Sequence, residues 1–241
     1  MTANYLDQLK DAYDDSFPYA LDNRLIMNWY PERIISRMPG GSLLELGVGH
    51  GFCSLRLASH FGQHIIIEGS GQLIEKFKRK ACGTEHVTLI QTFFEDFTTE
   101  EKFDVVLMGF VLEHVKDPDF IVDKFKDYLK PNGSIFITVP NANALNKRLG
   151  YEAGMIADLN TLSEADLALG HKRLFTVDSL RALVEKNACR IEMMEGLFLK
   201  PITTQQIHEL KLPEEILQAM LKVGVNFPDL CVGILAEAKR L

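Results

Sequence analysis

The chain has 241 residues, 46% hydrophobic and 24% charged, with a formal net charge of −7 at pH 7. This composition is ordinary for a globular protein, and we expect one domain over residues 1–241. The negative charge disfavours a nucleic-acid partner, which usually requires a basic face. No apolar run approaches the length of a bilayer span, so we expect no membrane partner.

The N-terminal segment and the cysteines indicate a compartment. The segment MTANYLDQLKDAYDD lacks the basic start and apolar middle of a signal peptide, which predicts a cytoplasmic protein. No two cysteines form a CxxC pair, so a zinc site or redox dithiol is not expected. We interpret the cysteines as small core residues; they are Cys53, Cys82, Cys189 and Cys231.

Aromatic residues are concentrated before the first expected strand. We predict that residues 1–38 form a helical cap that packs on the rest of the domain. The aromatic side chains of this cap are Tyr5, Tyr13, Phe17, Tyr19, Trp29 and Tyr30.

Short apolar runs then alternate with helical patterns over residues 39–140, the expected core. In chain order we predict a strand at 42–47, a helix at 52–61, a strand at 64–69, a helix at 71–81, strands at 87–94 and 103–109, a helix at 117–130, a turn at 130–133 and a strand at 134–140. This alternation predicts an α/β fold with a parallel sheet and helices on both faces. Ligands of such sheets bind beyond the carboxyl ends of the strands.

The rhythm changes after residue 140. Two long insertions, 141–172 and 201–228, are expected to form lids over a substrate, because long loops in compact domains are usually functional. Between and after them we predict a helix at 177–188 with Thr176 as its N-cap, a strand at 189–198 and a last strand at 231–239.

A glycine-rich turn, ELGVGHG at 45–51, follows the first strand and precedes a helix. Such turns bring backbone N–H groups close to a ligand. A dinucleotide fingerprint needs a third glycine at the position that Phe52 occupies here, which argues against a nicotinamide dehydrogenase. The alternative ligand is a cationic amino-acid sulfonium, for which the acid in front of the glycines is useful.

With these residues the sequence resembles the class I S-adenosylmethionine (SAM) dependent methyltransferases. Glu68 ends the second strand 19 residues after Gly49, and FDVVLMGFVLEHVKDP (103–118) and LKPNGSIFITVPN (129–141) follow in the family's order. The resemblance implies a seven-stranded Rossmann-like sheet of order 3-2-1-4-5-7-6 with strand 7 antiparallel. It also implies SAM as the cofactor and S-adenosyl-L-homocysteine as its product.

The resemblance assigns a cofactor role to residues along four strand ends. Gly47 and Gly49 would line the methionine portion with Glu45 nearby, and Glu68 would bind the ribose hydroxyls. The remaining implied contacts are Gly69 and Ser70 near adenosine, Phe93 and Phe94 beside adenine, with Glu95 as a substitute for the family's usual aspartate, and Met108 and Gly109 near the reactive methyl.

Two histidines are candidates for a general base. His114 lies in a segment that resembles the E-x-x-E-H motif of ubiquinone-biosynthesis O-methyltransferases, where that motif has been linked to a metal. Phe110 replaces its first acid, so we expect no metal here. His171 lies at the end of the first lid. Either histidine has a simpler interpretation as a residue that hydrogen-bonds locally.

Other polar residues flank the lids. Asn141 and Asn143 are candidates to orient substrate, and Lys172 and Arg173 are candidates either to hold an anionic substrate or to be surface charge. We expect the other histidines to point away from SAM or to lie on the surface; they are His50, His60, His64, His86 and His208.

The resulting hypothesis is methyl transfer from SAM to a hydroxyl of a small molecule, such as a secondary metabolite, sugar or quinone-like compound. Methylation of a small amine is the nearest alternative. A non-catalytic SAM-binding partner protein would retain the same motifs. The residue pattern does not determine the oligomeric state.

Overall fold

The computed structural model describes residues 19–81, 84 and 86–241, so Tyr5, Tyr13, Phe17 and Cys82 lie outside the described residues. Within them, seven strands form one sheet in the order β3-β2-β1-β4-β5-β7-β6. The first five strands are parallel, and β7 pairs antiparallel with both neighbours. The predicted sheet order and the antiparallel seventh strand are confirmed.

The elements alternate as the apolar pattern predicts. The strands are β1 (Ser42–Leu46), β2 (Gln63–Glu68), β3 (Val87–Gln91), β4 (Phe103–Gly109), β5 (Leu129–Pro140), β6 (Cys189–Leu197) and β7 (Gly233–Arg240). The helices are α1 (Ala20–Arg37), α2 (Phe52–Ala58), α3 (Gly71–Lys80), α4 (Pro118–Lys126), α5 (Leu145–Glu152), α6 (Glu164–Ala168), α7 (Val177–Lys186), α8 (Thr204–Leu210) and α9 (Glu214–Gly224).

The helix predicted to reach residue 130 ends at Lys126, and the strand predicted to reach residue 94 ends at Gln91. The predicted turn at 130–133 is also wrong, because these residues belong to β5. Phe103 pairs with Leu129, but Val105 pairs with Ser134, so the β4–β5 register shifts across this segment. Asn132 takes a left-handed backbone with φ +66°, which asparagine tolerates better than most residues. The turn residues therefore form an irregularity within a strand.

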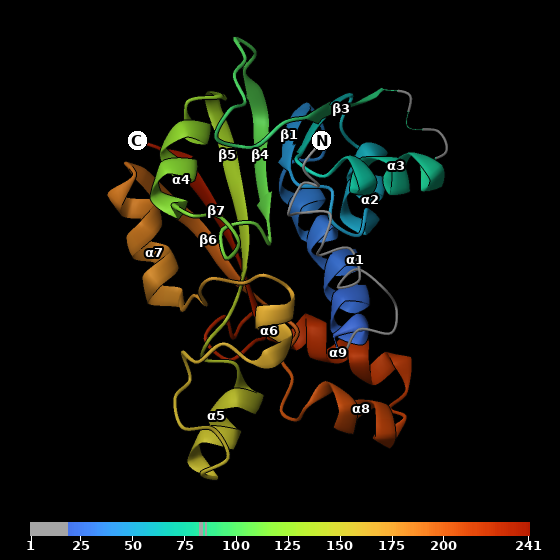
Figure 1. Cartoon of the computed structure of the whole chain (residues 1–241), viewed down its shortest axis with the longest axis vertical. Coiled ribbons are helices and arrows are strands. Elements are labelled where there is room, and N and C mark those ends of the chain that lie inside the picture. Colours follow the sequence, from blue (N-terminus) through green and yellow to red (C-terminus); the bar gives the residue numbers. More distant parts are fainter. Residues whose placement is uncertain (1–18, 82–83, 85) are drawn as a thin grey trace.

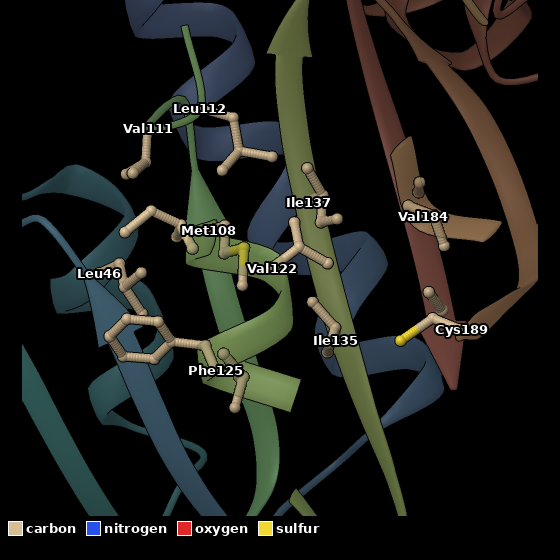
Figure 2. Packing of buried hydrophobic residues seen from close by; sticks show 14 of the residues in the cluster. Leu46, Met108, Val111, Leu112, Val122, Phe125, Ile135, Ile137, Val184 and Cys189 are labelled. Carbon is tan, nitrogen blue, oxygen red and sulfur yellow. The ribbon is translucent and has the colours of Figure 1, made fainter. Parts of the chain in front are cut away.

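Helices cover both faces of the sheet (Figure 1). On one face, α4 and α7 pack on the central strands, and Figure 2 shows Leu46, Met108, Phe125 and Ile137 in this core. The opposite face is covered by α1, α2 and α9. Pro118 in the first turn of α4 and the side-chain cap from Thr176 to the Ser179 amide in α7 begin these helices, as the sequence predicts.

The insertions gather at one end of the molecule. The parallel strands point their carboxyl ends toward α5, α6, α8 and α9, which lie together at the bottom of Figure 1. This placement puts the lids where ligands of parallel sheets bind. Across the described ranges, no helix is long and apolar enough to cross a membrane.

Candidate active site

A cavity of about 570 Å³ lies between the carboxyl ends of the strands and the lids. This volume is in the range of small-molecule and cofactor sites. Its wall runs from the glycine loop and Glu68 at one end to His171 and Lys200 at the other. We call these the cofactor end and the acceptor end.

The glycine loop forms one wall of the cofactor end. Gly47, Gly49 and Gly51 have φ values of +78°, +46° and +82°, a region that side-chain-bearing residues rarely adopt. A Cβ atom at Gly51 would come within 2.9 Å of the Phe77 ring, so a larger residue there would displace α3. The glycines thus allow both the turn and the close packing of the helix behind it.

Glu68 holds a fixed position beside this loop. Its carboxylate accepts hydrogen bonds from the backbone amides of Val48, at 3.0 Å, and Ser70, at 2.7 Å. These bonds tie the end of β2 to the glycine loop, and Glu68 lines the cavity while being almost fully buried. The carboxylate is therefore oriented before any ligand binds.

Glu45 and His64 form a buried pair under the loop, and the expectation of a surface position for His64 is wrong. His64 is fully buried, and its Nε2 lies 2.7 Å from the Glu45 carboxylate. Ser54 donates a second hydrogen bond to Glu45 at 2.9 Å. Glu45 lines the cavity, but its carboxylate is bonded to His64 of β2 and Ser54 of α2. These bonds fix the first strand to its neighbours.

The other predicted cofactor residues divide into two groups. Those that line the cavity are Gly69, Phe93, Phe94, Glu95 and Gly109. Ser70 instead caps α3 by accepting a hydrogen bond from the Leu73 amide. Met108 is fully buried in the core against α4 (Figure 2), because strand alternation turns its side chain away from the face that holds Glu45.

The acceptor end brings both candidate histidines together. The rings of His114 and His171 lie 4.8 Å apart, edge to face. The buried Glu113 is their neighbour, and donor atoms of all three lie within 4.8 Å of one another. Glutamate and two histidines form a set that divalent metals accept, so this cluster is where a metal ion could bind.

The environment shifts the pKa values of Glu113 and His114. Burial raises the pKa of Glu113 to about 8, and within the described residues neither carboxyl oxygen has a hydrogen-bond partner of normal geometry. Burial, reinforced by the charge of His171, lowers the pKa of His114 to about 3. At neutral pH Glu113 is therefore mostly protonated and His114 is neutral.

His171 is oriented by α6. Its Nδ1 lies 3.2 Å from Asp166, which also accepts hydrogen bonds from the backbone amide and hydroxyl of Ser163 at the N-cap. Burial raises the pKa of Asp166, but the neighbouring His171 and the hydrogen bonds from Ser163 outweigh it and bring the pKa to about 2. Asp166 is thus an anion throughout the neutral range and lies beside the His171 ring.

Polar residues that flank the lids have structural partners. The Asn141 amide donates to the carbonyls of Pro228, Asp229 and Cys231, and its oxygen accepts from the Asn143 amide. Asn141 therefore joins the two lids while it also lines the cavity. The Arg173 guanidinium donates to the carbonyls of Leu112, Val115 and Lys116 and secures the loop after β4.

Several cavity residues carry no recognisable sequence signal. Lys200 is buried and pairs with the buried Asp22 of α1, while Thr204 contacts both groups. Asp22 and Lys200 are 178 residues apart, so local patterns cannot join them. His50 also lines the cavity, stacked on Phe52, in contrast to the predicted outward orientation.

A family model described as a methyltransferase domain matches residues 21–192, most of the described chain. The chain belongs to this family. The methyltransferases of the family depend on SAM, and the predicted relationship to the class I enzymes is confirmed.

Two curated relatives match about half of this methyltransferase. It is 29% identical to an uncharacterized protein of Mycobacterium tuberculosis over 127 residues. The aligned segment covers 51% of this chain and 43% of that protein. It is 31% identical to a ubiquinone biosynthesis O-methyltransferase of Glaesserella parasuis serovar 5 over 144 residues. This aligned segment covers 56% of this chain and 59% of that enzyme. The chain thus spans about half the length of both relatives.

A solved structure shows the same fold over nearly the whole chain. An N-methyltransferase of Bradyrhizobium japonicum WM9, crystallised with S-adenosyl-L-homocysteine, aligns with a TM-score of 0.62 and 13% identity over 97% of each chain. The cofactor end has features that suit this kind of ligand: glycines permit close backbone approach, and an oriented carboxylate suits a ribose.

Proposed function

We propose that this methyltransferase transfers the methyl group of SAM to a hydroxyl of a small molecule, with His171 as the general base. The observation that supports it is one cavity that joins the glycine loop to an oriented histidine. SAM supplies an activated methyl group, so the protein has to place the acceptor, exclude water and remove one proton.

The cofactor end is assigned as follows. Glu68 accepts hydrogen bonds from the ribose hydroxyls, and the backbone of Gly47 and Gly49 lies along the methionine portion. Phe93, which is 42% exposed on the cavity wall, and Phe94 pack against adenine. Glu95, Gly69 and Gly109 complete this end, and Glu45 contributes by holding the loop through His64.

At the acceptor end, His171 accepts the proton of the acceptor hydroxyl through Nε2. Asp166 lies at Nδ1 and stabilises the imidazolium that forms, an arrangement that also fixes the tautomer. The neutral His114 and the protonated Glu113 line the same space and orient the acceptor by hydrogen bonds. We propose that no metal ion takes part in this step.

The cofactor assignment is tested by calorimetric titration with S-adenosyl-L-homocysteine. We expect Glu68→Ala to weaken binding by about tenfold or more, roughly 1.4 kcal/mol, because it removes the oriented carboxylate. Glu75→Ala, on the exposed face of α3, is the matched control and should bind as the wild type does. Equal affinity of wild type and Glu68→Ala would contradict the ribose assignment.

The base is tested by measuring initial rates with hydroxyl-bearing and amine-bearing acceptors across pH. We expect His171→Gln to lower kcat by about a hundredfold or more with unchanged S-adenosyl-L-homocysteine affinity, and the wild-type rate to fall as the histidine protonates. A chelator should leave the rate unchanged. Loss of activity with chelator and recovery with Mg²⁺ would replace the base mechanism with a metal-bound hydroxyl, and turnover of amines alone would replace O-methylation.

A further inference from the structure

We propose that the acceptor carries a carboxylate and that Lys147 of α5 binds it. The inference rests on the proposed function, since it describes the acceptor of the same cavity. The lid helix α5 places Lys147 and its neighbour Asn146 on the cavity wall, in the same lining as His171.

Lys147 is a cation without an anion. Its side chain is partly buried, and its Nζ lies 3.4 Å from the Leu159 carbonyl. Among residues 19–81, 84 and 86–241, no carboxylate lies within ion-pair distance of this Nζ. Burial lowers the pKa of Lys147, and the negative charges of Asp166 and Asp158 act in the opposite direction. Because the pKa remains lowered, these two charges do not offset the loss of hydration of the ammonium group. A ligand anion would supply the missing charge.

The two nearest carboxylates are occupied by other groups. Asp166 accepts from Ser163 and lies beside His171, and Asp158 accepts hydrogen bonds from the backbone and side chain of Asn160. Neither carboxylate forms an ion pair with Lys147 in the structure.

The other basic residues of this region are used differently. Lys200 is paired with Asp22, and Arg173, one of the two residues predicted to hold an anion, is bonded to three backbone carbonyls. Lys116 and Lys172 also line the cavity, but both are exposed and well hydrated. Lys147 is therefore the partly buried cation that remains available for a bound anion at the acceptor end.

The acids of the cavity argue against a cationic acceptor. Glu45 and Asp22 already face His64 and Lys200, and Asp166 lies beside His171. Among the described residues of the acceptor end, these carboxylates already have partners, and an ammonium group would also be repelled by Lys147. A carboxylate gains an ion pair in a partly desolvated site, where charge pairing is stronger than in water.

Asn146 adds a second, neutral requirement beside Lys147. Its Oδ1 is buried and has no hydrogen-bond partner in the part of the chain that the structure describes. An N–H or O–H donor of the acceptor, close to its carboxylate, would satisfy this oxygen and avoid the cost of leaving it unpaired.

The test compares acids with their own amides. Protein saturated with S-adenosyl-L-homocysteine is titrated by calorimetry with two pairs of different shape, protocatechuate with its amide and glucuronate with glucuronamide. We expect the acid of at least one pair to bind about tenfold or more tightly than its amide, roughly 1.4 kcal/mol. Lys147→Gln should abolish this preference, and Lys147→Arg should retain it because the charge is kept.

Lys172→Gln is the matched control, since it removes a cation of the same lining and should keep the acid preference. Binding of S-adenosyl-L-homocysteine by each variant shows that it is folded. If that binding is intact and neither acid binds better than its amide, or if the preference survives in Lys147→Gln, the carboxylate site is overturned while the proposed methyl transfer stands. If wild type does not bind S-adenosyl-L-homocysteine, the proposed function itself fails.

Discussion

The two ends of the cavity are built in different ways. The cofactor end is made by consecutive residues at strand ends, where Glu68 bonds the amides of Val48 and Ser70 and the glycine loop follows β1 directly. The acceptor end is assembled by side chains from α1, the loop after β4, α5, α6 and the segment after β6. Its buried pair, Asp22 and Lys200, joins positions 178 residues apart.

This difference means that the geometry of the cofactor end is fixed by the fold, whereas that of the acceptor end depends on individual side chains. A cofactor end made of backbone and strand ends is specified by the fold itself, and its geometry depends on few side chains. An acceptor end made of lid side chains changes with substitutions that leave the sheet intact. Cofactor and acceptor specificity can therefore vary independently in this protein.

The largest effect that we expect follows from breaking the buried pair at the cofactor end. His64→Leu leaves the Glu45 carboxylate buried without its histidine partner, which should lower the free energy of unfolding by about 3–5 kcal/mol. Urea denaturation monitored by circular dichroism measures this loss.

Lys200→Met is the matched substitution at the acceptor end, since it leaves Asp22 buried in the same way. If the acceptor end opens locally, as lids do, Asp22 regains water and the global loss should be clearly smaller than for His64→Leu. Equal losses in the two variants would show that the lids unfold only with the sheet, and the contrast between the ends would disappear.

The glycine turn and the acid that ends β2 lie where the sequence predicts them, because both depend on short-range patterns that survive any arrangement of the lids. The strand order was implied by the family resemblance and is confirmed. Met108 shows the limit of motif transfer, because the motif marks the strand end while strand alternation decides which side chain faces the cavity.

The acceptor end was predictable only in part. The motifs predict that His114 and His171 lie near the cavity, but not their 4.8 Å contact or the dyad with Asp166. Asn141 is a candidate substrate ligand because it follows a strand, and it lines the cavity, but its side-chain amide bonds carbonyls almost ninety residues away in the chain. No pattern indicates such partners.

A second, somewhat smaller effect concerns Glu113 and pH. Its folded pKa of about 8 lies above its ordinary 4.5, so between these values the folded state binds more protons than the unfolded state. The stability that Glu113 contributes is therefore complete at low pH and is lost as pH rises toward 8, by a few kcal/mol.

Glu113→Gln cannot titrate, so its stability should fall less than that of the wild type over this range. Urea denaturation of both proteins at several pH values gives the two slopes. Parallel curves would contradict the raised pKa and would place a compensating cation beside the carboxyl. Because Glu113 belongs to the acceptor end, S-adenosyl-L-homocysteine affinity should be the same in both proteins at neutral pH.

The smallest effect that we expect on stability is the most specific for function. Ser163 and Thr176 are both N-caps with a reciprocal capping box, on α6 and α7 respectively. Replacing either with alanine removes a cap worth about 1 kcal/mol. Only Ser163 also bonds Asp166, so only Ser163→Ala should loosen the group that orients His171.

Ser163→Ala should thus lower kcat by about tenfold, the rate equivalent of roughly 1.4 kcal/mol, while S-adenosyl-L-homocysteine affinity is unchanged. Thr176→Ala should show a loss of about 1 kcal/mol in stability with normal kcat, because α7 packs on the sheet and Thr176 does not line the cavity. Comparing kcat of the two variants separates orientation of the base from general weakening of the fold. If both variants lose rate equally, α6 is only a support for the lid, and His171 does not depend on Asp166.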